Sequence, residues 1–383
     1  MNGNTDNATN FDSLDINDNL LRGIYSYGFE KPSNIQTKSI PIINSGKDLI
    51  AQSQSGTGKT GAFSIGVLNN INVEEKSIQA IVISTTHELA IQTYDVMKSI
   101  SGYMDVNIKK VIGKTNMNES RAELYQNPHV IIATPGRLLD MINRNYLFTD
   151  KIKMLVFDEA DEILSYGFMD TIYNIIKCVP KEAQICLFSA TLPEQILELS
   201  KKFMNNPEEL LINKENLTLE GIKQFYVNCN FYKWKYDVLQ DLYKSITINQ
   251  CIIYVNTKNI LNNLVDTLTK NDYPVSFIHG ELTADDRKKN LNDFRQGTSR
   301  ILISTDLLSR GIDIQQLSLV INFDLPKSKE TYIHRIGRSG RYGRKGISIN
   351  FITNEEVEYI KELEKFYNTE INEMPENISE FIN

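Results

Sequence analysis

The sequence predicts an α/β protein of two domains, each a doubly wound parallel sheet, joined by a short linker. Short runs rich in Ile, Val and Leu alternate with longer helical patterns in both halves of the chain. A near-continuous apolar run is typical of a strand buried on both faces of a parallel sheet. Alternating strands and helices imply right-handed crossover units. The length of 383 residues suits two domains, since roughly 150 residues make one.

The apolar runs give the predicted order of strands. They lie at 80–85, 129–134, 153–158 and 184–190 in the first half, and at 251–256, 275–279, 300–305 and 319–323 in the second. The intervening segments predict helices, for example at 87–101 and 193–204. The polar stretch 205–222, with Pro207 and Gly221, interrupts this rhythm and is interpreted as the connection between domains. The predicted boundaries are a disordered tail at 1–10, a first domain at 11–208, a linker at 209–221 and a second domain at 222–383.

The composition excludes several classes of protein. A hydrophobic share of 41% and a charged share of 23% exclude a disordered chain, a collagen and a coiled-coil rod. The first residues lack the basic flank and apolar core of a secretory signal, and no run approaches the ~18 apolar residues of a membrane helix. We therefore expect a cytoplasmic or nuclear protein that does not bind membranes. The four cysteines have no metal-ligand spacing, so we expect reduced thiols in protein cores.

A phosphate-binding loop is predicted at residues 53–60, which read SQSGTGKT. An apolar segment precedes the loop and a helical pattern follows it, so backbone amides and a helix N-terminus would face the phosphates. The first position of the GxxxxGK[ST] pattern is Ser53 in place of Gly. A loop that only caps a helix is the alternative. The predicted nucleotide contacts are Ser53, Gln54, Ser55, Gly56, Thr57, Gly58, Lys59 and Thr60, with Lys59 on the β- and γ-phosphates and Thr60 on Mg²⁺.

Residues 158–161, which read DEAD, directly follow the apolar run MLVF. An acidic residue at the carboxyl end of a parallel strand faces the ligand crevice. Asp158 is therefore predicted to hold Mg²⁺, and Glu159 to polarise the attacking water. Acidic residues at a helix start also complement the helix dipole. The phosphate loop elsewhere in the same domain favours the catalytic interpretation.

These motifs resemble the DEAD-box family of RNA helicases, which implies two RecA-like domains and ATP as the substrate nucleotide. Residues 28–36, GFEKPSNIQ, resemble the adenine-reading Q motif, whose predicted extent is 11–36 with Phe11 as the upstream aromatic residue. By this resemblance, Gln36 hydrogen-bonds the adenine edge and Phe29 lies against the base. The run at 20–36 most specifically resembles the translation initiation factor 4A group, although exon-junction and ribosome-assembly relatives share the same core.

The resemblance also assigns roles elsewhere in the chain. The segment SAT at 189–191 resembles the motif that couples hydrolysis to RNA binding, which assigns coupling to Ser189 and Thr191 together with Asp161. The segments 300–314 and 334–341 resemble the second-domain motifs. They imply that Asp313 contacts the ribose. The implied catalytic residues of the second domain are His334 and the two arginine fingers Arg338 and Arg341.

RNA is the implied partner, bound through its sugar–phosphate backbone. Hydroxyls, backbone amides and arginines suit such contacts, which position a strand without reading its sequence. Each loop taken alone is also compatible with ordinary turn chemistry. The predicted RNA-binding residues are Thr86, Gly113, Thr134, Arg137, Thr257, Arg287 and Thr305.

Three departures from the family pattern lie on RNA-binding or supporting elements. The usual PTRELA reads Thr85-Thr86-His87-Glu88-Leu89-Ala90, the double glycine reads Gly113-Lys114, and the Gln of the QxxR element is Ala284. None of them lies in the nucleotide core. We therefore expect near-normal ATP binding with altered RNA affinity or coupling. His87 is interpreted either as a surface replacement or as a pH-dependent substitute for arginine.

The leading hypothesis is a monomeric helicase that opens short RNA duplexes when ATP closes its two domains, with protein partners that regulate closure. The alternative is an ATP-gated RNA clamp that recruits other proteins. A DNA translocase or a metabolic kinase explains less of the sequence. The net charge of −7 argues against binding RNA through total charge alone. However, residues 287–345 carry 13 Lys+Arg against 5 Asp+Glu, so the basic character is local to the second domain.

Overall fold

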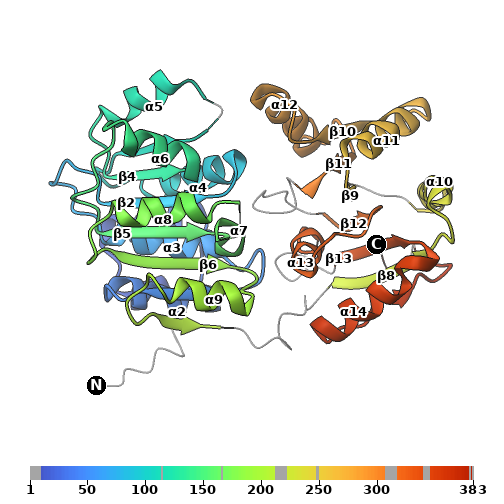
Figure 1. Cartoon of the computed structure of the whole chain (residues 1–383), viewed down its shortest axis with the longest axis horizontal. Helices are drawn as coiled ribbons and strands as arrows, with labels where there is room; N and C mark the ends of the chain where they lie inside the picture. Colours follow the sequence, from blue (N-terminus) through green and yellow to red (C-terminus); the bar gives the residue numbers. More distant parts are fainter. Residues whose placement is uncertain are drawn as a thin grey trace. The chain divides into compact units, whose positions relative to one another are not determined.

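The computed structural model describes residues 10–113, 115–164, 167–211, 222–246, 250–306, 317–339, 346–378 and 381. The chain divides into two compact units, Met1–Ile212 and Asn213–Asn383. Each unit contains one parallel seven-stranded sheet with helices on its faces (Figure 1). The predicted fold class is therefore confirmed. Most of the predicted tail and most of the predicted linker lie outside the described residues.

The sheet of the first unit has the strand order β3-β4-β2-β5-β6-β1-β7. Every pairing in it is parallel. The strands are β1 Leu49–Gln52, β2 Ala80–Ser84, β3 Ile108–Val111, β4 Val130–Ala133, β5 Met154–Asp158, β6 Gln184–Ser189 and β7 Glu208–Leu210. The central strands are buried throughout, as their apolar runs predict.

Helices cover both faces of this sheet (Figure 1). They are α1 Asp18–Tyr27, α2 Asn34–Asn44, α3 Lys59–Asn69, α4 His87–Ile100, α5 Met117–Leu124, α6 Pro135–Asn143, α7 Ala160–Ile163, α8 Met169–Lys177 and α9 Glu194–Ser200. Alternate residues of each strand join different cores because successive side chains point to opposite faces. Val82 packs with residues of α1 to α4, whereas its neighbours Ile81 and Ile83 pack with residues of α6 and α8.

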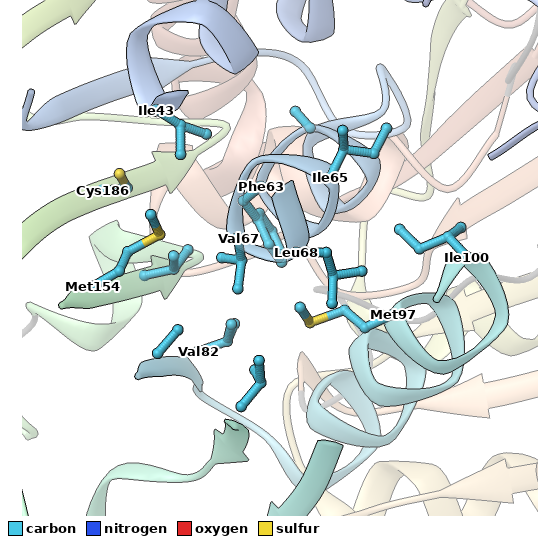
Figure 2. Packing of buried hydrophobic residues seen from close by; sticks show 14 of the residues in the cluster. Ile43, Phe63, Ile65, Val67, Leu68, Val82, Met97, Ile100, Met154 and Cys186 are labelled. Carbon is cyan, nitrogen blue, oxygen red and sulfur yellow. The ribbon is translucent and has the colours of Figure 1, made fainter. Parts of the chain in front are cut away.

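Helix α3 lies at the centre of the first of these cores. Figure 2 shows Phe63, Val67 and Leu68 of α3 among side chains from two helices and three strands. The other labelled residues are Ile65 of α3, Ile43 of α2, Met97 and Ile100 of α4, Val82 of β2, Met154 of β5 and Cys186 of β6. Burial on all sides holds α3 firmly, which fixes the N-terminus of α3 where the glycine-rich loop ends.

The second unit repeats this plan with the strand order β10-β11-β9-β12-β13-β8-β14, again entirely parallel. Its strands are β8 Ile222–Asn228, β9 Cys251–Tyr254, β10 Val275–Ile278, β11 Ile301–Ser304, β12 Leu319–Asn322, β13 Gly346–Ile352 and β14 Asn372–Glu373. Its helices are α10 Lys235–Ser245, α11 Lys258–Lys270, α12 Ala284–Arg295, α13 Lys329–Ile336 and α14 Val357–Tyr367. No helix among the residues described here is long and apolar enough to cross a membrane.

Some local expectations differ from the structure. The segment 205–222, interpreted as a connection between domains, contains strand β7, which pairs in parallel with β1. The predicted helix at 193–204 is shorter, because α9 gives way to turns with i→i+3 hydrogen bonds after Ser200. Cys178 is exposed, so the expectation of core thiols is wrong for this residue, although the other three cysteines are buried.

We expect Gly23→Ala to destabilise the first unit, because α1 approaches α4 closely at this glycine. A Cβ atom on Gly23 would lie 1.8 Å from the backbone oxygen of Ile100. The backbone must shift to accept it, at a cost of about 3 kcal/mol in the free energy of unfolding. Urea denaturation of the full chain followed by circular dichroism measures this cost. The control is Gly136→Ala, where no atom lies within 4 Å of the new Cβ; equal midpoints for the two variants would contradict the close approach.

Candidate functional site

The phosphate loop connects strand β1 to helix α3. Gly56 and Gly58 have φ values of 80° and 99°, a left-handed backbone that favours glycine. Gly58 is also the N-cap of α3, so the free amides of the first helical turn adjoin the loop. The ammonium of the buried Lys59 donates to the carbonyl oxygens of Ser53 and Gln54, at 2.6 and 2.9 Å. The loop therefore combines helix amides and a lysine, which together suit a polyphosphate.

Ser53, which replaces the first glycine of the usual pattern, has a defined place in the loop. Its backbone amide donates to Ser189 O at 3.0 Å and so extends the β1–β6 pairing by one residue. Its hydroxyl hydrogen-bonds the hydroxyl of Thr57, which in turn donates to Gln54 O at 2.8 Å. The serine side chain thus stabilises the loop through a hydrogen bond inside it.

The acidic pair lies at the end of β5. Asp158 is the last residue of the strand and Glu159 follows with φ 57° and ψ 55°, a left-handed conformation that costs a non-glycine residue energy. Both side chains are buried. Burial, and then the neighbouring Glu159, raise the pKa of Asp158 to about 8, while the Lys59 ammonium opposes this shift. Such a carboxyl group gains stabilisation from a nearby cation.

Asp161 joins the acidic motif to the SAT segment. Its two carboxylate oxygens accept hydrogen bonds from Ser189 Oγ at 2.7 Å and from Thr191 Oγ1 at 2.6 Å. All three side chains are buried. The structure therefore brings together the three residues that the sequence assigns to coupling. A shift of either segment changes the hydrogen bonding of the other.

Gln36 lies against the phosphate loop. Its Oε1 accepts from the amide of Ser33 in the capping box of α2, and its Nε2 donates to Gly58 O at 3.2 Å. Phe29 stacks with Phe11 at a centroid distance of 6.3 Å. Gly61 makes this packing possible, since its Cβ would lie 2.7 Å from Gln36 Nε2 and 3.1 Å from the Phe29 ring. The sequence analysis missed Gly61, whose signal is a glycine inside a buried helix.

The RNA-binding residues predicted in the first unit occupy neighbouring loops. Thr134 Oγ1 accepts from the Gly113 amide at 2.9 Å, so these two predicted residues are bonded to each other. Arg137 donates to Ser120 Oγ at 2.7 Å and to Thr115 O at 2.8 Å, which joins α6 to the loop before α5. Thr115 and Ser120 lie outside the predicted set. Sequence spacing gives no signal for them.

Two more predicted threonines are helix N-caps. Thr86 Oγ1 accepts from Leu89 N at the start of α4, and Thr257 Oγ1 accepts from Ile260 N at the start of α11. Thr86 follows strand β2 and Thr257 follows strand β9, so each lies beyond the carboxyl end of a parallel strand. His87, which differs from the family pattern, is the first residue of α4 and is half-buried.

The remaining predicted residues of the second unit lie on or near its helices. Arg287 of α12 is buried and donates to Gly280 O at 2.6 Å. Thr305 directly follows β11, and its amide donates to Ile278 O at 3.4 Å. His334 and Arg338 are buried at the end of α13, where Arg338 Nε donates to His334 O at 3.2 Å. Three residues named in the sequence analysis lie outside the described residues: Asp313, Arg341 and Lys114, the last of which differs from the family pattern. The side chain of Ala284 also lies outside them.

Arg335 is an organising residue that the sequence analysis missed. It is fully buried on α13. Its guanidinium donates to Asp306 Oδ1 and Asp324 O, both at 2.6 Å, and to Asn256 Oδ1 at 2.9 Å. These partners follow strands β11, β12 and β9, so one side chain fixes three loops. Its fork of donors suits this task better than a lysine would.

Comparisons with known proteins give the family of this chain. Residues 33–199 match the family model described as DEAD/DEAH box helicase, and residues 234–343 match the helicase conserved C-terminal domain. The chain is 48% identical to "Eukaryotic initiation factor 4A" of Caenorhabditis elegans, over 99% of this chain and 95% of that one. It is 50% identical to "ATP-dependent RNA helicase eIF4A" of Candida albicans, over 98% and 95%.

Solved structures of related proteins share the fold of this chain. Yeast Dbp5 bound to RNA and ADP BeF3 has a TM-score of 0.92 at 36% identity, covering 98% of this chain and all of that one. Mss116p bound to ssRNA and AMP-PNP has a TM-score of 0.88 at 27% identity, over 99% and 82%. Fold, phosphate loop and acidic motif define a nucleotide-dependent helicase. The chain belongs to the eIF4A family of DEAD-box ATP-dependent RNA helicases, which are RNA-dependent ATPases.

We expect Gly61→Ala to weaken ATP binding. The new methyl group would displace Gln36 and the Phe29 ring, the two side chains assigned to adenine. A loss of about 1–2 kcal/mol, or roughly 5- to 30-fold in Kd, is the expected scale for a shifted hydrogen bond and ring. The matched control is Gly66→Ala on the same helix, where the three atoms nearest to the new Cβ all belong to Ile43 and none to Gln36 or Phe29. Titration with a fluorescent ATP analogue should separate the two variants, and equal affinities would remove Gly61 from the adenine site.

Proposed function

We propose that this helicase acts in translation initiation in the cytoplasm, where it grips single-stranded RNA and opens short duplexes at the expense of ATP. The main support for the proposed nucleotide site is the alignment of three neighbouring strands. Gln52 of β1 pairs with Ser189 of β6, and Phe188 of β6 pairs with Asp158 of β5. The phosphate loop, the SAT segment and the acidic pair therefore start side by side. The role in initiation is supported by 48–50% identity to proteins named eIF4A.

The chemistry needs charge stabilisation more than covalent catalysis, because phosphoryl transfer passes through a loose, highly charged transition state. In our proposal Lys59 contacts the β- and γ-phosphates, while Glu159 polarises the attacking water. Arg338 and Arg341 act as arginine fingers, and His334 completes the catalytic set.

A bound Mg²⁺ fits the residues present. Thr60 offers a hydroxyl, and Asp158 offers a carboxylate whose burial beside Glu159 favours a cation. Asp158 ends β5 and Thr60 lies in the first turn of α3, which follows β1 of the same sheet, so both lie at the carboxyl edge of that sheet. When bound, Mg²⁺ would supply positive charge that neutralises the charge of the phosphates.

RNA would be held by hydroxyls, amides and arginines spread over both units. The residues assigned to it are Thr86, Gly113, Thr134, Arg137, Thr257, Arg287 and Thr305. Ser189, Thr191 and Asp161 would transmit changes between the nucleotide and this strand. We further propose a monomer whose target is chosen by protein partners. Yeast Dbp5 has been solved with Nup159 and Gle1, which supports partner control in a relative.

The decisive experiment has two parts. The ATPase rate of the full chain is measured with single-stranded RNA, with DNA of the same sequence and without nucleic acid; stimulation by RNA alone is expected. The chain is then added to a translation extract depleted of its own eIF4A. It should restore translation of a reporter with a structured leader more than that of an unstructured one. Stimulated ATPase without restored translation would place the helicase in another RNA pathway.

We expect Glu159→Gln to abolish turnover while ATP binding persists. The amide keeps the size of the side chain but cannot polarise water as a carboxylate does, so the RNA-stimulated rate should fall by about 10²-fold or more. Glu182→Gln, an exposed glutamate on the turn before β6, is the control and should turn over like the unaltered chain. Retained turnover in Glu159→Gln would assign water activation to another group.

We expect the affinity for Mg²⁺ in the nucleotide complex to rise between pH 6 and pH 8. Burial raises the pKa of Asp158 to about 8, so below that pH a proton competes with the metal. Each unit of pH should then change the half-saturating Mg²⁺ concentration by about tenfold. In Asp158→Asn the dependence should disappear together with tight metal binding. A flat profile in the unaltered chain would show that Asp158 does not take up a proton in this pH range, and unchanged metal binding in Asp158→Asn would exclude it as the metal ligand.

A further inference from the structure

A run of exposed aromatic residues lies in the second unit between β8 and α10. We call residues 231–234 the aromatic turn; they are Phe231, Tyr232, Lys233 and Trp234, and the last three form a single 3₁₀ turn. All four are exposed, with Phe231 at 57%, Trp234 at 41% and Tyr232 at 40% of their full accessible surface. Three adjacent aromatic rings in water form an apolar patch of a kind that marks a binding site.

Hydrogen bonds and ring packing hold the aromatic turn against the rest of the second unit. Tyr232 donates from its hydroxyl to Asp324 Oδ1 at 2.8 Å, and its ring meets the edge of Phe323 at 6.1 Å. The next residue, Lys235, is fully buried, and its ammonium donates to Phe323 O at 3.0 Å and to Glu356 at 3.2 Å. These contacts fix the Tyr232 ring and anchor the end of the turn at Lys235, so the turn itself loses little conformational entropy when a ligand binds.

The same contacts connect the turn to a loop assigned to RNA. Asp324 uses its other oxygen, Oδ2, to accept the amide of Asn256 at 2.8 Å. Asn256 directly precedes Thr257, the N-cap of α11 and one of the proposed RNA contacts. One carboxylate therefore joins the aromatic turn to the loop after β9. The turn follows the carboxyl end of β8 in the same parallel sheet, so both lie along the same edge.

We propose that the aromatic turn is a base-stacking platform for single-stranded RNA, next to the backbone-binding loops. This inference rests on the proposed RNA-binding function and adds to it a contact with bases. Exposed aromatic faces stack on any base, and a neighbouring cation attracts the phosphates. Phe231 and Trp234 supply the rings, which lie edge to face with centroids 5.1 Å apart and planes at 88°. Lys233 supplies the charge, with its ammonium 5.9 Å from the centroid of the Trp234 ring. A protein partner would also bury aromatic residues, but the exposed lysine and the connection to Asn256 favour RNA.

The sequence provides an internal probe, since Trp234 is the single tryptophan of the chain. The full chain is titrated with a single-stranded uridine oligonucleotide in the presence of a non-hydrolysable ATP analogue, and the intrinsic fluorescence is followed. Stacking on the platform should quench the emission. An abasic ribose-phosphate oligonucleotide of the same length should bind more weakly and leave the emission nearly unchanged. Equal quenching by the two oligonucleotides would overturn base stacking.

Substitution gives the second readout. Phe231→Ala removes an exposed ring and should weaken RNA binding by about 5- to 150-fold, the scale of one lost stacked base, whereas Phe231→Tyr should restore it. The matched control is Phe366→Ala, an aromatic residue of the same unit that is 42% exposed with Lys329 5.1 Å above its ring. RNA affinity in Phe231→Ala equal to that of the control would overturn the platform while the proposed function stands. If RNA neither binds nor stimulates the ATPase of the unaltered chain, the proposed function itself fails.

Discussion

The register of the parallel strands β1, β6 and β5 is the constraint on which the nucleotide site depends. These strands are hydrogen-bonded neighbours whose carboxyl ends lie within one residue of each other, with Gln52 opposite Ser189 and Phe188 opposite Asp158. The residue after each end is therefore delivered to one edge without any long loop. A slip of one residue in β6 would move Ser189 away from the carboxylate of Asp161. It would also break the bond from Ser53 N to Ser189 O. Backbone pairing thus sets the relative positions of the phosphate loop, the SAT segment and the acidic pair.

In the second unit, a buried arginine positions the loops at the carboxyl edge of the sheet. Arg335 binds groups that follow three different strands, and its guanidinium lies 5.2 Å from the Tyr254 ring. Desolvating a guanidinium is costly unless its donors are satisfied, so this arrangement specifies the loop positions more than it adds stability. Removal of Asp306 or Asn256 would leave part of a buried cation without an acceptor. The loops around Arg335 therefore depend on one another for their stability, although they lie far apart in the sequence.

The apolar runs of the sequence predict central strands such as β5 and also the edge strand β10, but they miss the edge strands β3, β7 and β14 and the interior strands β8 and β13. A central strand such as β5 is apolar throughout because both of its faces are covered. The edge strands β3, β7 and β14 read IKKV, EEL and NE, are short, and carry exposed or half-exposed residues. Nothing in their composition separates them from loops. The site shows the same division. The phosphate loop is one continuous segment of the sequence, and so is the acidic motif. The contacts of Arg137 with Thr115 and of Arg335 with Asn256, in contrast, join residues far apart in the chain.

The two interpretations of the threonine loops, turn chemistry and RNA binding, are compatible. A hydroxyl offers one donor and two acceptor sites. Thr86 and Thr257 each use an acceptor site to cap a helix, and this bond does not consume the hydroxyl proton. A phosphate oxygen requires a donor. The helix N-terminus next to each cap carries further amides and a partial positive charge that favour an anion. Capping therefore fixes the hydroxyl at the position where a sugar–phosphate strand would need it, and the two units place such a threonine after corresponding strands, β2 and β9.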